Sequence, residues 1–556
     1  MLEPPYLHEV RDCTMGYKFL IKKQNGAWPK EGLPAFVLEQ DRWDDYGFRT
    51  QYHLSYVTLD ESGHRIVDHI GPVKILRIGQ ADNGKAQVNS SFDELDDDFC
   101  SVGQSLDYYQ RLGQLPRLKR KQALTGLRDI VFEPELEEIF RNEKGWATSL
   151  FRDEKDDKYL KIAYGLVTGD YTELPGEELA FSVKFDNWLN GLDFEFINRR
   201  PYRRGRSILP GRIAVLVGAN GSGKSTVLAR IARLAFATIA ERKEMKSLGA
   251  LKPPGIGFPR IVTISFSAFD SFLLPGSNTR NRRKILDEMA SGTGRFAYIG
   301  LRDLTAEGSR IARGAESESS PFGDADRLGA TRLKSIEKIA EEFYLYLSRI
   351  TDPTKITILK CLLKVLLAGS AFDEFLDRDL SELDKETVLS VFLKCSTGHK
   401  IAALVVTSLI AVTVPSSLVL FDEPETHLHP PLLAALMYAI RAIMENNNSF
   451  CIIASHSPVV VQETLGADVS VLKRDGDWAF AEGVSGETFG ESIGLITSEV
   501  FGLNPEATDY HRILDDLVDR MDDQEDLEGL FLQGQMSHQA RSYSMSRRLF
   551  LKRTKK

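Results

Sequence analysis

The stretch Ile213-Ala-Val-Leu-Val-Gly-Ala-Asn-Gly-Ser-Gly-Lys-Ser-Thr-Val-Leu228 decides the fold of this 556-residue chain. A short apolar run leads into a glycine-rich turn, and the turn opens into a pattern with helical spacing. Residues 218–225 fit the phosphate-binding pattern G-x-x-x-x-G-K-[ST] at every position, in the strand–loop–helix context that this pattern requires. The alternative is a chance match in a loop, and the flanking strand and helix argue against it.

Each residue type in this loop has a chemical reason. The glycines let the backbone turn its N–H groups inward, which forms a nest for phosphate oxygens at a helix N-terminus. Lys224 adds positive charge for the β- and γ-phosphates, and the Ser225 hydroxyl can ligate Mg²⁺. We therefore expect ATP and Mg²⁺ as cofactors. The expected ATP-binding residues of the loop are Gly218, Ala219, Asn220, Gly221, Ser222, Gly223, Lys224, Ser225 and Thr226.

Composition narrows the class of protein. A chain of 556 residues is too long for one core, so two or three domains are expected. No run of apolar residues is long enough for a membrane span, and the N-terminus lacks the pattern of a secretory signal. The five cysteines are scattered without a C-x-x-C pair, which argues against a zinc site and fits a reducing cytoplasm. The net charge of −9 leaves nucleic-acid binding to local basic patches.

The first 180 residues are predicted to form an α+β region. Two segments with strand-like alternation flank a turn at 60–63 and read as a β-hairpin, and helical spacing runs over residues 105–142. We expect some of the strands to join the antiparallel sheet of a nucleotide-binding core, and the helical part to be an extra module. The expected strands are residues 52–59, 65–67, 73–78, 160–164 and 179–185.

After the phosphate-binding loop the chain alternates between strands and helices, as in a parallel sheet covered on both faces. Residues 266–329 are rich in Gly, Ser and Arg, and long loops are expected there. The segment from residue 491 onward reads as helical. The expected strands are 260–265, 418–421, 450–454 and 469–472, and the expected helices are 334–350, 356–367 and 431–445.

Two adjacent acids follow the strand at 418–421. A P-loop enzyme needs a carboxylate at this point to hold Mg²⁺, and we assign that role to Asp422. The next acid can orient or deprotonate the attacking water, so Glu423 is the expected catalytic base. Two acids after a strand often form only a solvated turn, but the phosphate-binding loop upstream favours the catalytic interpretation.

Two further sites fit the same chemistry. Ser396 and Gly398 open a helix and would offer a second anion-binding end, with a simple N-cap as the alternative. His456 follows the strand at 450–454, and ligands bind at such strand ends in open α/β sheets. A lone histidine is usually structural, yet this one occupies the place of a γ-phosphate sensor, and we count it with Glu423 as catalytic.

Together these segments resemble the motifs of ABC-type ATPases, specifically the RecF/SMC/OLD branch. The resemblance covers residues 181–472 and implies that Asp422 and Glu423 are the Walker B pair, 425–429 the D-loop and His456 the switch histidine. The quoted motifs are Gly218–Ser225, Ser396-Thr-Gly398, Asp422-Glu-Pro-Glu-Thr-His-Leu-His-Pro430 and Ser455-His-Ser-Pro458.

The resemblance also implies a head-to-tail dimer that sandwiches ATP, in which Ser396 and Gly398 are the signature that contacts the γ-phosphate held by the other subunit. The chain departs from the family at Cys395, where Leu is usual, and at His399, where Glu or Gln is usual. The glutamine expected after the strand at 260–265 is missing, and Asp270 is its candidate substitute.

His427 and His429 invite a metal interpretation. Two histidines without further ligands at metal spacing make a weak site, so we interpret them as D-loop residues.

The predicted fold class is therefore α/β, a P-loop ABC-type ATPase head of mixed or parallel sheet and helices, with a helical lobe and an extra N-terminal α+β region. The predicted domains are 1–180, the N-terminal region; 181–255, the core with the P-loop; 256–394, loops and helical lobe; 395–480, the core with signature, Walker B, D-loop and switch histidine; and 481–556, a helical region with a basic tail.

The whole pattern looks like the ATPase halves of two-component antiphage systems, such as the PtuA-type ATPases of Septu, found alone or with a retron. This resemblance implies a cytoplasmic, oligomeric ATPase that regulates a partner nuclease, of HNH type or another effector, with a retron reverse transcriptase and its msDNA as further expected partners. OLD-family nucleases carry a Toprim domain after the ATPase. About 100 residues follow His456, too few for the ATPase ending plus that domain, so no nuclease domain is recognised.

The main alternative is a RecF/SMC-like DNA repair or recombination ATPase that binds DNA directly. Its support is local positive charge in residues 199–206, 280–284 and 547–556, although such runs are usually solvated surface. A transporter ATPase is disfavoured by the E-T-H-L-H-P string and the long N-terminal region. A stand-alone nuclease that uses unrecognised acids is a third alternative.

Overall fold

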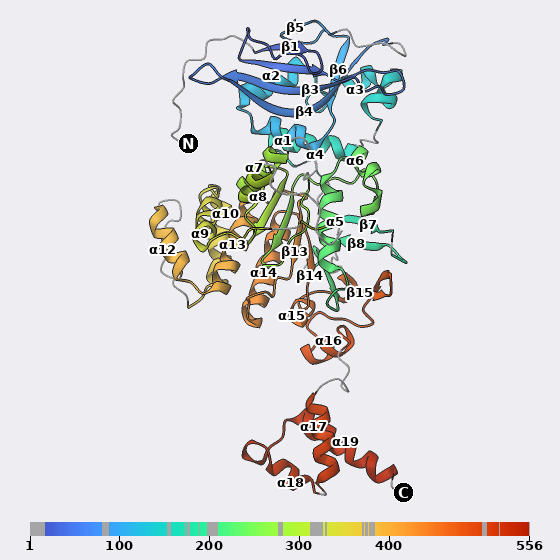
Figure 1. Cartoon of the computed structure of the whole chain (residues 1–556), viewed down its shortest axis with the longest axis vertical. Helices are drawn as coiled ribbons and strands as arrows, with labels where there is room; N and C mark the ends of the chain where they lie inside the picture. Colours follow the sequence, from blue (N-terminus) through green and yellow to red (C-terminus); the bar gives the residue numbers. More distant parts are fainter. Residues whose placement is uncertain are drawn as a thin grey trace, which may run out of the picture. The chain divides into compact units, whose positions relative to one another are not determined.

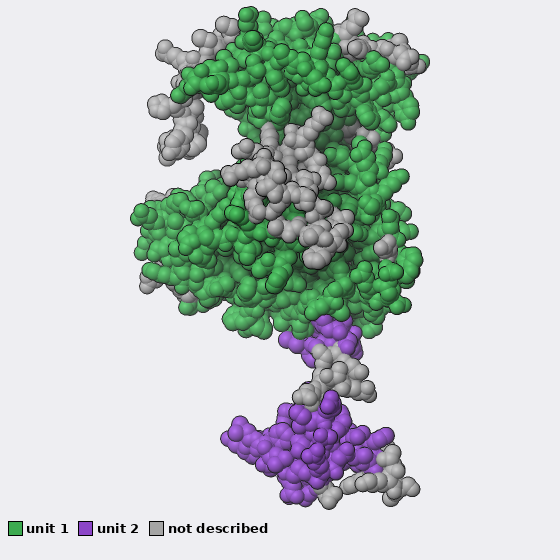
Figure 2. All heavy atoms as spheres, viewed as in Figure 1, with its two compact units in different colours: residues 1–489 green, residues 490–556 purple. Residues whose placement is uncertain are grey.

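The computed structural model divides into two compact units, residues 1–489 and 490–556 (Figure 2). No helix in the described parts of the chain combines the length and the apolar character that a membrane span requires. The structure describes residues 17–80, 88–152, 157–172, 174, 178–186, 188–196, 209–275, 282–311, 326–328, 331–369, 372, 376, 378, 384–502, 509–521 and 523–554.

The N-terminal lobe, defined here as the described residues of 17–174, is built on a six-stranded sheet in the order β5-β1-β2-β3-β4-β6 (Figure 1). Strands β1 and β2 pair in parallel, and the other neighbours are antiparallel. The predicted hairpin is confirmed as β3 and β4, and the strand predicted at 73–78 is the second half of β4. The strands are β1 (Lys18–Lys22), β2 (Ala35–Gln40), β3 (Gln51–Leu59), β4 (Arg65–Arg77), β5 (Ser91–Phe92) and β6 (Phe99–Gly103).

Helices of the same lobe cover both faces of this sheet. Along β4, Ile75 belongs to one buried apolar cluster and its neighbour Leu76 to another, as expected because successive side chains of a strand point to opposite faces. The first cluster also contains side chains of α1, α2 and α4, and the second contains those of α3 and η1. The bounds are α1 (Leu106–Gln114), α2 (Arg117–Gly126), α3 (Leu136–Phe140), η1 (Trp146–Leu150) and α4 (Asp157–Thr168).

The prediction of a strand at 160–164 was wrong, because these residues lie inside α4. The buried side chains of this helix include Ile162, Ala163, Leu166 and Val167, which repeat at helical spacing and face α1. The two helices approach closely at Gly113, where an added Cβ would lie 2.2 Å from the carbonyl oxygen of Leu166. A window of five residues is too short to distinguish this spacing from that of a strand.

The P-loop lobe, defined here as the described residues of 178–489, contains a seven-stranded sheet in the order β12-β11-β13-β14-β9-β15-β16 (Figure 1). Only β16 runs antiparallel to its neighbour. All residues of β9 and β14 are buried, as predicted for strands covered on both faces. The strands are β9 (Ile213–Gly218), β11 (Ile261–Ser265), β12 (Phe296–Gly300), β13 (Leu418–Asp422), β14 (Phe450–Ala454), β15 (Val469–Asp475) and β16 (Trp478–Gly483).

A separate three-stranded antiparallel sheet, β10-β7-β8, packs within the same lobe. Its strands are β7 (Leu179–Lys184), β8 (Leu192–Phe196) and β10 (Ala250–Lys252). The sequence analysis expected some earlier strands to join this sheet, but the described strands β1–β6 pair only within the N-terminal sheet. Only the strand predicted at 179–185 belongs here, because the earlier strands already bury both faces of a sheet of their own.

Helices pack against both faces of the seven-stranded sheet. Helix α5 shares an apolar cluster with β9, β13 and β14, and α13 is buried along most of its length. The predicted helices at 334–350, 356–367 and 431–445 are confirmed as α9, α10 and α14. The helices are α5 (Lys224–Phe236), α6 (Ile239–Glu244), η2 (Lys246–Leu248), α7 (Arg282–Ser291), α8 (Leu304–Ile311), α9 (Ile336–Ser348), α10 (Pro353–Leu366), α12 (Lys385–Lys394), α13 (Thr397–Val412), α14 (Pro430–Asn446), α15 (Pro458–Gln462) and η4 (Gly466–Asp468).

One strand of the large sheet was missed. The sequence analysis expected long loops over residues 266–329, but all five residues of β12 are buried and pair with β11. Helices α7 and α8 flank this strand in the chain. The Gly-, Ser- and Arg-rich composition around it concealed a short apolar run.

The second unit is helical over its described residues, as predicted. Its helices are α16 (Ile493–Glu499), α17 (Asp509–Arg520), α18 (Gln524–Gly529), η6 (Leu532–Gly534) and α19 (His538–Thr554).

Two leucines of α2 give a matched test of the N-terminal lobe. Leu124 is 1% exposed in the apolar cluster, whereas Leu118 is 81% exposed. We expect Leu124→Ala to destabilise the lobe by about 2–5 kcal/mol, because it removes buried methyl groups and leaves a cavity. Leu118→Ala is expected to change stability by no more than about 0.5 kcal/mol. Urea unfolding of both variants measures the difference, and equal midpoints would contradict the packing described for α2.

Candidate nucleotide site

The candidate site lies where three parallel strands end side by side. Strand β14 pairs with β9 on one side and with β13 on the other, so the segments that follow the three strands meet at one edge. Backbone bonds continue this register beyond the strands. The N–H of Ser455 donates to the carbonyl of Leu216 at 3.0 Å, and the N–H of Glu423 donates to the carbonyl of Ala454 at 2.8 Å. The predicted P-loop, Walker B acids and His456 are thereby brought together.

The P-loop adopts a backbone that requires glycine. Gly218 has φ +153°, and an added Cβ would lie 2.4 Å from the carbonyl oxygen of Leu472. Gly221 and Gly223 have φ values of +80° and +99°, and Gly223 is the N-cap of α5. Ala219, Asn220 and Gly221 are exposed, while Ser222 is buried and its hydroxyl has no hydrogen-bond partner among the described residues. A concave loop with an unsatisfied donor fits a phosphate group.

Lys224 is held inside this loop. Its side chain is buried, and Nζ donates to the carbonyl of Gly218 at 3.0 Å and to that of Ala219 at 3.3 Å. Burial lowers the pKa of Lys224, and the charges of Asp422 and Glu423 oppose this shift. The ammonium therefore sits at the base of the loop that would receive phosphates. Thr226 follows in the first turn of α5 and is partly buried.

Ser225 and Asp422 form a donor set that fits Mg²⁺. The Ser225 hydroxyl donates to Oδ1 of Asp422 at 3.0 Å. Burial raises the pKa of Asp422 to about 7, with a further contribution from the charges of Glu423 and Asp270, while Ser225 and Lys224 act in the opposite direction. A hydroxyl and a carboxylate amid excess negative charge suit a hard divalent cation. When bound there, Mg²⁺ would stabilise the negative charge that develops on the phosphates.

Glu423 and His456, which the sequence analysis assigned as catalytic, follow β13 and β14 at this same edge of the sheet. Glu423 has φ +48°, a conformation that is uncommon outside glycine and clusters at functional sites. His456 is partly buried, and burial, together with the charge of Lys224, lowers its pKa, which Glu423 partly offsets. A neutral imidazole predominates at neutral pH, so His456 can donate one hydrogen bond and accept another.

Glu425 is a site residue whose role the sequence analysis missed. Its carboxylate accepts the Ser455 hydroxyl at 2.9 Å and the backbone N–H of His456. Burial raises its pKa, and the hydrogen bonds from His456 and Ser455 act against that rise. Glu425 thus joins the segment after β13 to the segment after β14 and positions His456. The sequence contains the acidic motif at 422–430 and the serine-rich motif at 455–458. They lie some thirty residues apart, and their presence together was the signal for this contact.

Among the described residues, Ser396 and Gly398 form no side-chain hydrogen bond with the segments that follow these three strands. Ser396 is exposed and caps α13, with its hydroxyl accepting the N–H of His399 at 3.3 Å. Gly398 packs on the D-loop, where an added Cβ would lie 3.0 Å from the carbonyl oxygen of His427. The contact of Ser396 and Gly398 with ATP on a second subunit stays a prediction.

Asp270 already has three partners within the chain. Its carboxylate accepts the Tyr298 hydroxyl at 2.8 Å and the Phe272 N–H at 3.2 Å, and it lies 3.5 Å from the Arg302 guanidinium. Arg302 is fully buried and also pairs with Glu307 at 2.8 Å. These partners hold the carboxylate of Asp270 in place. That Asp270 replaces the missing glutamine stays a prediction.

The remaining predicted residues have local structural roles or lie outside the residues that the structure describes. His429 caps α14, with Nδ1 accepting the N–H of Leu432 at 3.2 Å. No group of three or more His, Cys, Asp or Glu side chains among the described residues is placed to hold a metal. The arginine run at 199–206 and Arg280 lie outside the described residues.

The close approach at Gly218 gives a test of the loop. Gly218→Ala should abolish ATP binding, because the new methyl group would overlap the carbonyl of Leu472 and force the P-loop to shift. Gly483→Ala is the control, since an added Cβ at Gly483 meets no atom within 4 Å and its backbone is not left-handed. Titration with a fluorescent ATP analogue measures both. Unchanged affinity of Gly218→Ala would contradict the proposed phosphate position.

Part of the chain matches a known family, and most of it matches a phage protein. Residues 311–462 match the family described as "AAA domain, putative AbiEii toxin, Type IV TA system". Protein ea59 of Escherichia phage lambda is 29% identical over 522 residues, which cover 90% of this chain and 93% of that protein.

Two solved structures align with part of the chain. One is a nucleotide-free ATP-binding cassette from an ABC transporter, with TM-score 0.26 and 14% identity over 60% of this chain and 98% of that chain. The other is the SMC head domain from Thermotoga maritima, with TM-score 0.23 and 13% identity over 56% of this chain and 100% of that chain. The sheet order, the P-loop geometry and the match to an AAA domain family support an α/β fold of the P-loop type.

Proposed function

We propose that this protein binds and hydrolyses ATP with Mg²⁺, dimerises head to tail around the nucleotide and thereby regulates a partner effector in bacterial antiphage defence. The observation that carries the ATPase proposal is the hydrogen bond of 3.0 Å between Ser225 and Asp422, at the same edge as Lys224 and Glu423. This contact joins the phosphate-binding helix to the strand that carries the acids.

Each residue has a distinct role in the proposed reaction. Residues 218–226 hold the phosphates, and Ser225 and Asp422 hold Mg²⁺. Glu423 orients or deprotonates the attacking water, and His456 contacts the γ-phosphate as a neutral imidazole. Because Glu425 accepts the backbone N–H of His456, the position of this proposed sensor depends on the segment that follows β13.

Two substitutions separate binding from hydrolysis. Lys224→Ala should abolish ATP binding, because it removes the positive charge at the base of the P-loop. Glu423→Gln should bind ATP and slow its turnover by roughly 10²–10⁴-fold, the usual contribution of a general base. Phosphate release and nucleotide titration measure the two effects. If Glu423→Gln hydrolysed ATP at the wild-type rate, the base assignment would be wrong.

Matched controls for these substitutions lie on the β15–β16 hairpin. Lys473 and Glu482 form an ion pair at 2.5 Å and are about half exposed. Lys473→Ala and Glu482→Gln remove the same functional groups from an exposed ion pair outside the residues assigned to ATP and Mg²⁺, and both should keep wild-type ATP binding and turnover.

The dimer can be tested at the signature. Ser396→Asp should keep the N-cap of α13, because Asp caps helices as well as Ser does, but it adds a negative charge where the γ-phosphate of the other subunit is proposed to bind. In the Glu423→Gln background, this change should abolish the ATP-dependent dimer and spare ATP binding. Ser335→Asp, at the N-cap of α9, is the control. Analytical ultracentrifugation with ATP measures the dimer, and its persistence in Ser396→Asp would contradict the proposed interface.

The proposed regulatory role rests on the resemblance of the motifs to the ATPases of two-component antiphage systems. The matched family description names a toxin of a toxin–antitoxin system, and the matched ea59 protein comes from a phage. Affinity purification of the tagged chain from its native host, with mass spectrometry of stoichiometric partners, tests this role. A co-eluting nuclease, or a reverse transcriptase with its DNA, would support it. A chain that elutes alone and binds DNA in an ATP-dependent manner would favour the DNA repair alternative.

A further inference from the structure

The last residue of β11, Ser265, carries a buried hydroxyl that has no hydrogen-bond partner among the described residues. Only 2% of this residue is exposed. Burial of a hydroxyl without a partner costs free energy, so the few such groups in native proteins call for an explanation, for example a bound water or ion. The neighbours of Ser265 indicate which group its hydroxyl would bind.

Ser265 lies beside Asp422 on the adjacent strand. Strands β11 and β13 are parallel, and their register pairs Ser265 with Asp422. Adjacent strands are about 4.8 Å apart, and the side chains of a pair in register point to the same face of the sheet. At this spacing, one bound water can contact both side chains.

Both side chains face helix α5. Side chains alternate along a strand, so Ser265 shares a face with Ile261, and Asp422 shares a face with Leu420. Ile261 and Leu420 belong to the apolar cluster that contains the buried side of α5. The hydroxyl of Ser225, in the first turn of α5, donates to Asp422 at 3.0 Å. The three polar groups therefore lie on the same side of the sheet, at the same edge.

The residues on either side of this pair offer no polar side chain. Asp422 is flanked on its other side by Ala454, and Ser265 is flanked by Gly300. The carboxylate of Asp270, further along the chain, already has three partners. Ser265 is therefore the neighbour of Asp422 in this row that can still form a side-chain hydrogen bond.

A magnesium ion at Ser225 and Asp422 would need further ligands. Mg²⁺ prefers six oxygens in near-octahedral geometry and usually keeps several waters. Waters on a metal donate hydrogen bonds to outer partners, and these partners affect metal affinity. A serine hydroxyl can accept such a bond, because its oxygen has two lone pairs.

We propose that Ser265 is a positioning residue of the Mg²⁺ site, with its hydroxyl accepting a hydrogen bond from a water on the ion. Ser265 would act through this water, without contact with the ion or the nucleotide. The role rests on the proposed binding of ATP with Mg²⁺ and extends it, because it adds β11 to the strands that form the site.

The gain in nucleotide affinity that Mg²⁺ confers tests this role. The wild type and Ser265→Ala are titrated with a fluorescent, non-hydrolysable ATP analogue, once in EDTA and once in excess Mg²⁺. The ratio of the two dissociation constants is the gain. Ser265→Ala should keep the affinity measured in EDTA and reduce the gain about 10–100-fold, the usual effect of losing an outer partner of a metal site, or abolish a smaller gain.

Thr263→Val is the matched control. Thr263 lies two residues earlier on the same face of β11, and its hydroxyl also lacks a partner among the described residues. It pairs with Leu420 instead of an acid, so its hydroxyl is not beside the proposed Mg²⁺ position. Thr263→Val should therefore keep both affinities of the wild type.

The outcomes separate the role of Ser265 from the ATP site itself. An unchanged gain in Ser265→Ala would overturn the proposal and leave the ATP site intact. Equal losses of affinity in EDTA and in Mg²⁺, or the same loss of gain in Thr263→Val, would show that the hydroxyl only supports the fold, and would also overturn it. If Mg²⁺ gave the wild type no gain, the Mg²⁺ site would be wrong, and the role of Ser265 with it.

Thermal unfolding without ligand checks the fold of both variants. Neither substitution breaks a side-chain hydrogen bond among the described residues, so both variants should unfold close to the wild-type temperature. A lower unfolding temperature of Ser265→Ala with an unchanged gain would assign its hydroxyl to a water that only holds the fold, against the proposal.

Discussion

The parallel pairing of β9, β14 and β13 is the constraint on which the rest of the site depends. This register places the P-loop, His456 and the Walker B acids at one sheet edge, although nearly two hundred residues separate Ser225 from Asp422. A shift of one residue in any of the three strands would turn its buried side chains to the opposite face. Because all residues of β9 and β14 are buried, such a shift is strongly disfavoured.

The site is built from charges that the chain leaves incompletely compensated. Lys224 is buried against carbonyls, and burial, together with the charges of Glu423 and Asp270, raises the pKa of Asp422. By contrast, the acid Asp270 close to them is matched by Tyr298 and Arg302. Anionic phosphates would balance the charge of Lys224, and a divalent cation would balance that of Asp422. The charge of Asp270 is already balanced within the chain. The difference distinguishes groups arranged for ligands from groups that hold the fold.

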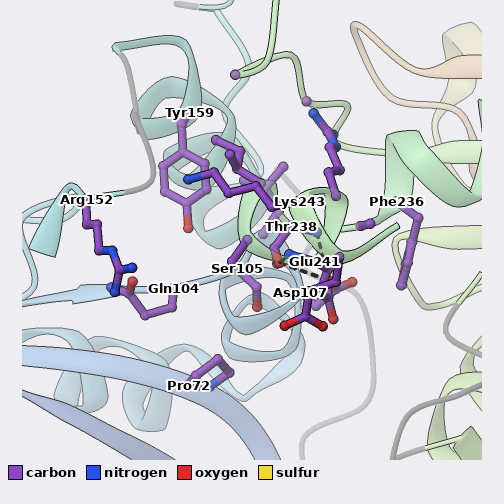
Figure 3. Close-up of a pocket in the computed structure, with 18 of the residues that line it drawn as sticks. Pro72, Gln104, Ser105, Asp107, Arg152, Tyr159, Phe236, Thr238, Glu241 and Lys243 are labelled. Atoms are coloured by element: carbon purple, nitrogen blue, oxygen red, sulfur yellow. Dashed lines mark hydrogen bonds between the residues drawn. The ribbon is translucent and has the colours of Figure 1, made fainter. Parts of the chain in front are cut away.

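The two lobes of the first unit meet through ion pairs between buried arginines and partly buried acids. Arg111 of α1 pairs with Glu288 of α7 at 3.0 Å, and Arg295 pairs with Asp107 at 3.3 Å. Burial makes these pairs sensitive to the loss of either partner, which ties the position of the N-terminal lobe to the segment between β11 and β12. A cavity of about 570 Å³ lies at this junction, where α5 ends (Figure 3).

The sequence by itself determined the P-loop, the two acids after β13 and the α/β class, because local spacing and strand composition encode them. It also placed α9, α10 and α14, whose apolar residues repeat over several turns. Only the tertiary structure decided that Glu425 holds the His456 backbone, that α4 is a helix and that β12 joins the large sheet. The sequence could not decide these features, because each depends on a partner distant in the chain: Ser455 and His456 for Glu425, α1 for α4, and β11 for β12.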